Sequence, residues 1–259
     1  MVIGTWQRSL GYWQALCLAL ALLIGVGGCA ADKAERKRDA ERTMNEGVLA
    51  LNAGNPNIAL ERLLEAEKQD PGSPYVHYNL GIAYLAKDVE NKAEQQFKEA
   101  IRLKPDYSEA YNSLGVLCLK RGQTEPAIQY FQKALSNILY ANPANAHYNM
   151  GRAYLARKDY AKAAEQMERA VRLVPDFAIA YNSLGEAYEG LGRNADAKRS
   201  YRNATQFAPN DAEAYLNLGK LLSRTGERAE ARKALNQVVR LVPDSREAQE
   251  ARKLLNAMK

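Results

Sequence analysis

The stretch NLGIAYLAKDVENKAEQQFKEAIRLKPD, residues 79–106, decides the fold. Gly81 and Tyr84 share one helical face in its first part, and its second part repeats apolar residues at helical spacing. A glycine inside a helix costs about 1 kcal/mol relative to alanine, so Gly81 needs a packing reason. Because glycine has no Cβ, a second helix can approach closely, and we expect its small residue Ala93 to lie opposite. The stretch therefore predicts a helical hairpin.

The ends of these helices also carry signals. Pro105 ends the second helix, because proline disfavours helical geometry in the residue before it. Ser73, Asp106 and Asp176 are placed to cap the next first helices, and Pro74 suits a first helical turn.

The hairpin pattern recurs along the chain. Its glycines are 34 residues apart, except for one step of 36, and an alanine follows each of them at a fixed distance. Most copies end in proline. The glycines are Gly47, Gly81, Gly115, Gly151, Gly185 and Gly219, and the prolines are Pro71, Pro105, Pro175, Pro209 and Pro243. A single hairpin hides only part of its apolar surface, so neighbouring copies must stack to bury the remainder.

These positions resemble the tetratricopeptide repeat (TPR), and the resemblance covers about residues 40–245. It implies an all-α fold, a right-handed α-solenoid of about six TPR helical hairpins. The implied repeats are 40–73, 74–107, 108–143, 144–177, 178–211 and 212–245. Residues 246–259 predict one more amphipathic helix, which we expect to cap the open end of the array. Its apolar face consists of Ala251, Leu254, Leu255 and Met258.

The beginning of the chain predicts an export signal. An apolar run at residues 15–26 is too short to cross a bilayer, which takes roughly 20 residues, and fits the core of a signal peptide over residues 1–28. VGGC, residues 26–29, resembles the lipobox of bacterial lipoproteins, which implies a lipid on Cys29 and a charged tether over residues 29–39. The next residue, Ala30, then favours sorting of the lipoprotein to the outer membrane, where the chain would face the periplasm. The alternative is an ordinary secretory signal in which Cys29 has no role.

Composition and charge narrow the function classes. The net charge of +6 is spread as alternating signs, which is typical of solvated helix faces and argues against a nucleic-acid partner. Of three cysteines, Cys17 should be removed and Cys29 acylated. Cys118 then stands alone at a core position, so no internal disulfide is expected.

The sequence offers no catalytic site. His77 and His147 both occupy the fourth position of a repeat, where packing explains them. They are two repeats apart, on the order of 20 Å, which excludes a shared metal. The carboxylates lie on polar faces, with no pair that has an evident reason for a shifted pKa. No glycine-rich phosphate loop occurs. We therefore expect no enzyme, no cofactor besides the lipid, no metal and no small-molecule substrate.

A surface remains as the candidate site. In TPR proteins, the first helix of each repeat lines the concave face, and asparagine and tyrosine there can hold an extended peptide. The positions implied here are Tyr75, Tyr78, Asn79, Ile82, Leu85, Asn112, Val116, Leu119, Tyr148, Asn149, Arg152 and Leu155. At the same offsets, the last repeats carry Glu186, Glu189, Glu213 and Lys220. The alternative is that the tether or a neighbouring copy covers part of this surface.

The 36-residue step marks an irregular joint. The expected proline is displaced to Pro143, and Leu139 and Tyr140 lie where the turn should be. Neutral drift in a surface loop is one explanation, because loop closure entropy grows only slowly with length. The other is a resemblance to the type IV pilus biogenesis lipoproteins, pilotins of the PilF/PilW kind. It implies a protein partner, the pilus secretin, whose outer-membrane targeting or assembly the chain would assist. The alternative function is a general cell-envelope TPR adaptor for peptidoglycan or outer-membrane assembly.

Overall fold

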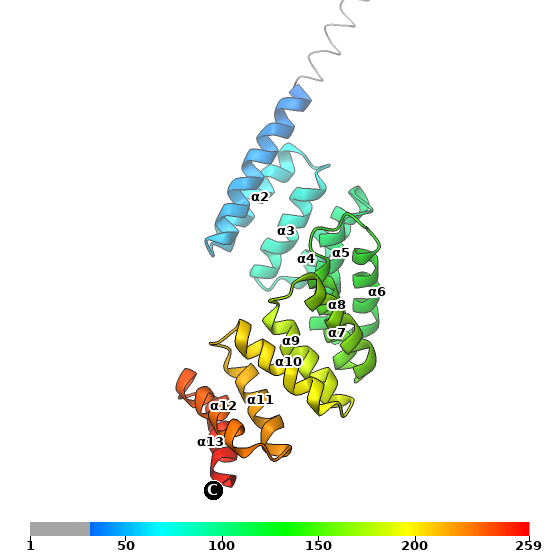
Figure 1. Cartoon of the computed structure of the whole chain (residues 1–259). Helices are drawn as coiled ribbons and strands as arrows, with labels where there is room; N and C mark the ends of the chain where they lie inside the picture. Colours follow the sequence, from blue (N-terminus) through cyan, green and yellow to red (C-terminus); the bar gives the residue numbers. More distant parts are fainter. Residues whose placement is uncertain (1–31, 259) are drawn as a thin grey trace, which may run out of the picture. The chain divides into compact units, whose positions relative to one another are not determined.

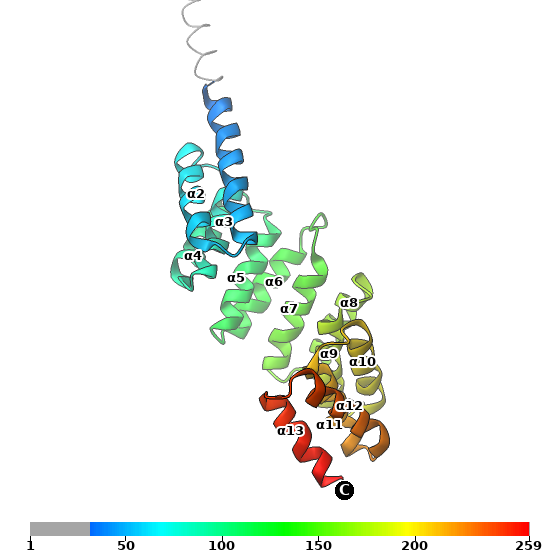
Figure 2. The ribbon, with the colours of Figure 1, turned by 90° about the vertical axis from the view of Figure 1, so that its left-hand side faces the viewer.

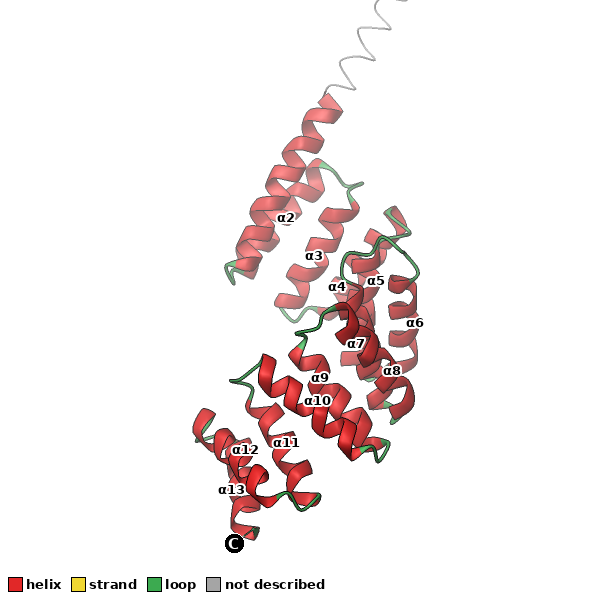
Figure 3. Ribbon diagram, viewed as in Figure 1, coloured by secondary structure: helices red, strands yellow, loops and turns green. Residues whose placement is uncertain are grey.

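The computed structural model describes residues 32–258, and every regular element in that range is an α-helix (Figures 1 and 3). The predicted signal peptide and Cys29 lie outside the described residues. Residues 32–52 form the first described helix, so most of the predicted tether is helical. No helix in the described range combines the length and the apolar character that crossing a bilayer requires.

The described residues divide into two compact units, with the boundary between Pro105 and Asp106. In the first unit, the helix at residues 32–52 is followed by α2 (Pro56–Gln69), α3 (Pro74–Ala86) and α4 (Glu90–Leu103). The second unit contains α5 (Ser108–Lys120), α6 (Thr124–Leu135), α7 (Pro143–Ala156), α8 (Tyr160–Leu173), α9 (Ala178–Gly190), α10 (Asn194–Phe207), α11 (Ala212–Arg224), α12 (Arg228–Leu241) and α13 (Arg246–Ala257).

Consecutive helices pack as hairpins within each unit (Figure 2). In the first unit, α3 pairs with α4. In the second, the pairs are α5 with α6, α7 with α8, α9 with α10, and α11 with α12. We call the first helix of each pair helix A and the second helix B. Helices A of neighbouring hairpins also touch, as α5 touches α7 and α7 touches α9. The predicted all-α architecture of stacked hairpins is confirmed.

The glycine of each hairpin does have a packing role, but the side chain opposite differs from the expected one. A Cβ on Gly81 would lie 2.4 Å from the ring of Phe97, so the aromatic residue of helix B fills the space that we expected Ala93 to occupy. The same relation holds between Gly115 and Phe131. The expectation for Ala93 was wrong because a large residue one turn later reaches across the gap; Ala93 itself is fully buried beside it.

Each turn between helix A and helix B contains one residue with left-handed backbone geometry. Glycine fills this position in three hairpins, at Gly122, Gly192 and Gly226, and between the helix at residues 32–52 and α2, at Gly54. Asp88 and Lys158 take it in the other two, with φ of 56° and 59°. Residues with a Cβ adopt this region at a cost, so these two turns are strained relative to the other four.

The helix caps confirm one prediction and correct two. Ser73 caps α3, because its hydroxyl accepts a hydrogen bond from the backbone N–H of Val76. Asp106 and Asp176 do not cap: α5 and α9 begin one residue later than expected, after Tyr107 and Phe177, without a side-chain cap.

The last helix covers the end of the second unit. Ala251 of α13 is buried in a cluster with Leu216, Leu235 and Val238, and the other three residues of the predicted apolar face border that cluster. They are Leu254, Leu255 and Met258. The predicted capping helix is therefore present, and its apolar face is the one that the sequence indicated.

Candidate partner-binding surface

The predicted surface residues of the first unit lie on α3 and are partly buried, except Tyr75, which is 47% exposed. Lys104 lies over the Tyr75 ring, 5.0 Å from its centroid, and its Nζ donates a hydrogen bond to the phenolic oxygen. The ring of Tyr78 packs on Phe97 at 5.8 Å between centroids. Ile82 and Leu85 continue the same half-buried row. Packing thus holds two tyrosine rings in place at the surface of this unit.

A pocket of about 650 Å³ adjoins these residues. Tyr75 and Asn79 form one side of it, and Met44 and Val48 of the first described helix form another. Asn79 donates its amide N–H to the Tyr75 carbonyl oxygen at 2.8 Å, so its Oδ1 is left to accept. The contribution of residues 37–48 was not predicted from the sequence, although the apolar spacing of Met44 and Val48 indicates it.

Two predicted asparagines of the second unit lie together. Asn149 of α7 donates its side-chain N–H to the Oδ1 of Asn112 of α5, at 3.2 Å. The pair recurs two hairpins later, where Asn217 donates to Asn182 at 3.1 Å. Each amide pair uses one donor and one acceptor, so further donors and acceptors remain for an extended peptide backbone.

Tyr148 is the aromatic centre of this region. Its ring packs against Phe177 at 5.3 Å and lies under the guanidinium group of the exposed Arg152 at 5.8 Å. Burial raises the pKa of the Tyr148 phenol, so it is neutral at physiological pH. The apolar residues predicted with it are half-buried and pack against the core of the second unit. They are Val116, Leu119 and Leu155.

Beyond this region, the helix-A face becomes acidic. A pocket of about 660 Å³ is lined by Glu186 and Glu189 of α9 and by Glu213 of α11. Tyr201 donates to Glu189 Oε1 at 2.7 Å, and Arg224 pairs with Glu189 Oε2 at 2.5 Å. Within residues 32–258, Glu186 and Glu213 have no such partner. The pocket is therefore suited to a cationic side chain.

This pocket corrects the expectation that no pair of carboxylates has an evident reason for a shifted pKa. Burial raises the pKa of Glu186, and the nearby Glu213 and Glu189 raise it further. Like charges held close together disfavour the ionised form, so a bound cation would stabilise it. Glu186 and Glu189 lie one turn apart on α9, whereas Glu213 is far from them in sequence and is brought close by the stacking of α9 and α11.

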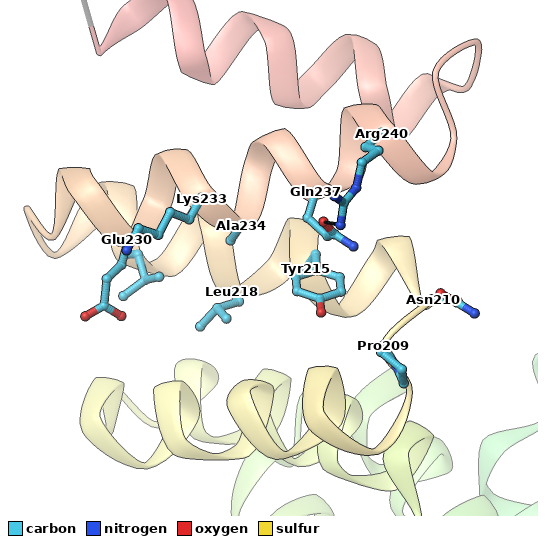
Figure 4. Close-up of a pocket in the computed structure, with 10 residues that line it drawn as sticks. Pro209, Asn210, Tyr215, Leu218, Glu230, Lys233, Ala234, Gln237 and Arg240 are labelled. Carbon is cyan, nitrogen blue, oxygen red and sulfur yellow. Dashed lines mark hydrogen bonds between the residues drawn. The ribbon is translucent and has the colours of Figure 1, made fainter.

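A further crevice opens beside helix B at the end of the second unit (Figure 4). It has a volume of about 710 Å³ and is lined by the half-buried Tyr215 and the buried Leu218 of α11, with Ala234 of α12 beside them. Glu230, Lys233 and Arg240 form a mixed polar edge. None of these residues was predicted as a site.

The three residues predicted together at the irregular joint differ in their surroundings. Leu139 is 84% exposed, whereas Tyr140 is buried at 8% and packs with Ala134 and Ala146. Pro143 is not in the loop, because it is the first residue of α7, where its fixed φ suits a first helical turn. Tyr140 therefore anchors the joint by its burial, and Leu139 is the most exposed of the three residues.

The two histidines lie in packed positions. His77 is buried, and its ring nitrogens lie 2.6 Å from Gln96 Oε1 and 2.9 Å from the Pro71 carbonyl oxygen. His147 is half-buried, with Nδ1 2.8 Å from Gln166 Oε1. Cys118 packs, half-buried, against the core. No group of three or more metal-ligating side chains occurs within residues 32–258.

All the family models that match parts of the chain describe the same type of repeat. Models described as tetratricopeptide repeat match residues 44–88, 74–107, 108–137 and 188–255. A model described as TPR repeat matches residues 151–192. The matched ranges leave residues 138–150, which include the joint, without a match.

Curated relatives include the type IV pilus assembly protein PilF of Pseudomonas aeruginosa, 25% identical over 164 residues. That match covers 60% of this chain and 65% of PilF. Anaphase-promoting complex subunit 3 of Schizosaccharomyces pombe is 31% identical over 117 residues, which are 44% of this chain and 17% of that protein. The chain thus spans less than two thirds of the length of these relatives.

Two solved structures have the same fold. The structure of Pseudomonas aeruginosa PilF superposes with a TM-score of 0.77 at 22% identity, over 85% of this chain and 99% of that one. PilW, a type IV pilus biogenesis factor, gives 0.75 at 22% identity, over 82% and 97% of the two chains.

Proposed function

The chain belongs to the tetratricopeptide repeat family, and we propose that it is a lipid-anchored scaffold that binds other polypeptides during type IV pilus biogenesis. The observation that carries this proposal is the match to PilF, which extends over 60% of the chain and is not confined to one repeat. Scaffolds of this kind perform no chemistry; they hold a partner.

The helix-A face supports binding of an extended polypeptide. The amides of Asn112 and Asn149 retain donors and acceptors for a peptide backbone, and Tyr148 beside them supplies a rigid apolar ring. Further along, Glu186 and Glu213 supply charge for a Lys or Arg side chain of the same partner. Hydrogen bonds to the partner's backbone would supply affinity. The Tyr148 ring and the carboxylates of Glu186 and Glu213 would fix which residues of the partner lie at each position.

The partner we propose is the secretin of the pilus machine, delivered to or assembled in the outer membrane. Lipid on Cys29 would hold the chain at that membrane. Each buried methylene of an acyl chain contributes about 0.8 kcal/mol, and two or more chains anchor stably. A tethered scaffold raises the local concentration of whatever it binds near the membrane.

A general envelope TPR adaptor is the second candidate. It rests on the repeat alone, which this chain also shares with anaphase-promoting complex subunit 3 over 44% of its length. Under this alternative, the same helix-A face would bind a different client.

Deletion of the gene tests the proposal. We expect heat-resistant secretin multimers to disappear and to return with the wild-type chain. Cys29→Ser should fail to restore them, and Asn112→Ala with Asn149→Ala should restore them only in part. Gln206→Ala, a change at an exposed position of α10, which is a helix B, is the matched control. Normal multimers and normal twitching motility in the deletion strain would remove the pilus function and leave the adaptor.

A further inference from the structure

The joint between the third and fourth hairpins forms a second pocket. It lies beside helix B, between α6, α7 and α8, and has a volume of about 440 Å³. Leu135, Ile138, Met150 and Leu173 give it apolar walls. It is distinct from the helix-A surface on which the proposed function rests, because it contains none of the residues predicted for that surface. The loop that carries Ile138 is visible between α6 and α7 in Figure 2.

The pocket exists in this form because the joint is longer than other connections. Residues 136–142 join α6 to α7, whereas residues 174–177 join α8 to α9 and residues 208–211 join α10 to α11. The longer loop adds Ser136, Asn137 and Ile138 to the pocket lining.

The loop holds its apolar residues out of the core. Asn137 donates its side-chain N–H to the Asp106 carbonyl oxygen at 3.0 Å and accepts from the Leu139 N–H at 2.9 Å. Tyr140 fixes the other side by its burial. Between these two anchors, Ile138 is 96% exposed and Leu139 84% exposed. Two neighbouring large apolar side chains with this exposure, at the edge of a pocket, are typical of a contact surface.

The charge of the pocket indicates what it binds. Arg169 lies in the lining, and no Asp or Glu does. Glu165 takes one N–H of Arg169 at 2.8 Å, which leaves most of the five guanidinium donors for another acceptor. His147 adds no charge near neutral pH, because burial lowers its pKa and Arg169 and Arg172 lower it further. The helix-A pocket has the opposite character, with three glutamates.

The crevice in Figure 4 lies at the equivalent position two hairpins later, so the two linings can be compared residue by residue. His147 and Met150 correspond there to Tyr215 and Leu218, and Arg169 corresponds to the neutral Gln237. That crevice also includes Glu230 in its lining. The joint pocket differs from it in having Arg169 and no carboxylate in its lining, whereas Glu230 lies beside Lys233 and Arg240 in the crevice. The joint pocket also has a projecting apolar loop beside it.

We propose that the joint pocket is a second docking site, which accepts an apolar side chain followed by a carboxylate in a partner polypeptide. The apolar side chain packs between Ile138 and Leu173, and the carboxylate pairs with Arg169. This separates two binding faces on one chain: an acidic one beside helices A and a cationic, apolar one beside helices B.

Fluorescence anisotropy with the full chain in detergent tests the proposal. The probes are two labelled peptides that contain Leu-Leu-Asp-Asp or the neutral Leu-Leu-Ser-Ser, and we expect the acidic peptide to bind more tightly. Arg169→Glu should weaken it roughly threefold to tenfold, since it replaces one surface ion pair by a repulsion. The same change should alter binding of the neutral peptide less than about twofold, and Arg169→Lys should keep the preference.

Ile138→Ser combined with Leu173→Ser should weaken both peptides, whereas Ile179→Ser, another exposed isoleucine, should weaken neither. The side chains of Ile138, Arg169, Leu173 and Ile179 are all exposed, so these substitutions should not prevent folding. Melting temperatures verify that each variant folds. If the double serine variant binds both peptides like the wild type, the pocket is not the site. If Arg169→Glu leaves the preference for the acidic peptide unchanged, the assignment of the carboxylate is wrong.

Discussion

The ring of Tyr160, at the start of α8, lies flat against the backbone of Gly190, at the end of α9. A Cβ on Gly190 would lie 2.4 Å from both Cγ and Cδ1 of that ring. Both residues line the acidic pocket beside Glu186 and Glu189. Gly190 is not one of the recurring glycines, so its role is local: it lets an aromatic ring form one wall of the pocket.

Gly190→Ala should destabilise the chain, because the contact involves the base of the ring, which cannot move without a change of rotamer. Overpacking costs about 1–3 kcal/mol, against a gain of about 1 kcal/mol in helix propensity. Urea unfolding measures the net loss. In a Tyr160→Ala background the ring is absent, so the same substitution should become stabilising. Equal effects in both backgrounds would contradict the contact.

Substitutions at the recurring glycines should differ with the side chain opposite. Gly115→Ala would bring a Cβ to 2.5 Å from the rigid ring of Phe131, whereas Gly151→Ala would meet the flexible end of Met167 at 2.8 Å. Since methionine can repack, we expect Gly115→Ala to cost about 2 kcal/mol and Gly151→Ala to be near neutral. Thermal melts of the two variants compare them directly. A larger loss at Gly151 would show that the Met167 side chain is fixed.

Lys158→Gly should stabilise the chain by about 0.5–1 kcal/mol, because it removes the left-handed strain of a residue with a Cβ. The control is Arg157→Gly at the preceding position, where φ is −87°, so that glycine relieves no strain, adds an entropic cost and removes the exposed ion pair with Glu125. Chemical denaturation of both variants decides the matter. A loss of stability with Lys158→Gly would mean that the lysine side chain contributes more than its backbone costs.

The two middle residues of the joint should respond in opposite ways. Tyr140→Ala empties a buried site and should destabilise by about 3 kcal/mol, whereas Leu139→Ala at an exposed site should stay within about 0.5 kcal/mol. Differential scanning calorimetry measures both. A large loss of stability with Leu139→Ala would show that Leu139 is packed in solution and is not available to a partner.

Glu186→Gln should raise the melting temperature at neutral pH. The pKa of Glu186 is raised in the folded chain, so ionisation above that pKa opposes folding. As the pH falls through the raised pKa, the wild type gains the stability that the variant already has, and the difference should vanish near the ordinary value of 4.5. Melts between pH 4 and pH 8 follow this change. A difference that does not depend on pH would exclude ionisation as its cause.

Much of the fold could be predicted, because the signals are local. Gly81 and Tyr84 lie within one helical turn of each other, and Pro105 acts on the residue before it. The cap predictions failed at Asp106 and Asp176 because α5 and α9 begin only after Tyr107 and Phe177, so each loop is one residue longer than expected. Phe97 was not predicted as the neighbour of Gly81, because the spacing of residues along a helix does not indicate how far a side chain reaches towards the next helix.

The candidate site was predicted less completely. The pairing of Asn112 with Asn149 and the coupling of Glu186 with Glu213 join residues on different hairpins. At the joint, the sequence indicated that residues 139 and 140 were unusual but not that one is buried and the other exposed.

By itself, the sequence determined the hairpins, their number and their order, because helix formation and the glycine spacing depend on residues within a few turns of each other. The tertiary structure alone decided which side chains meet and which face the solvent. Those contacts join residues about 20 to 40 positions apart, and their distances depend on how neighbouring helices pack, down to the reach of a single ring.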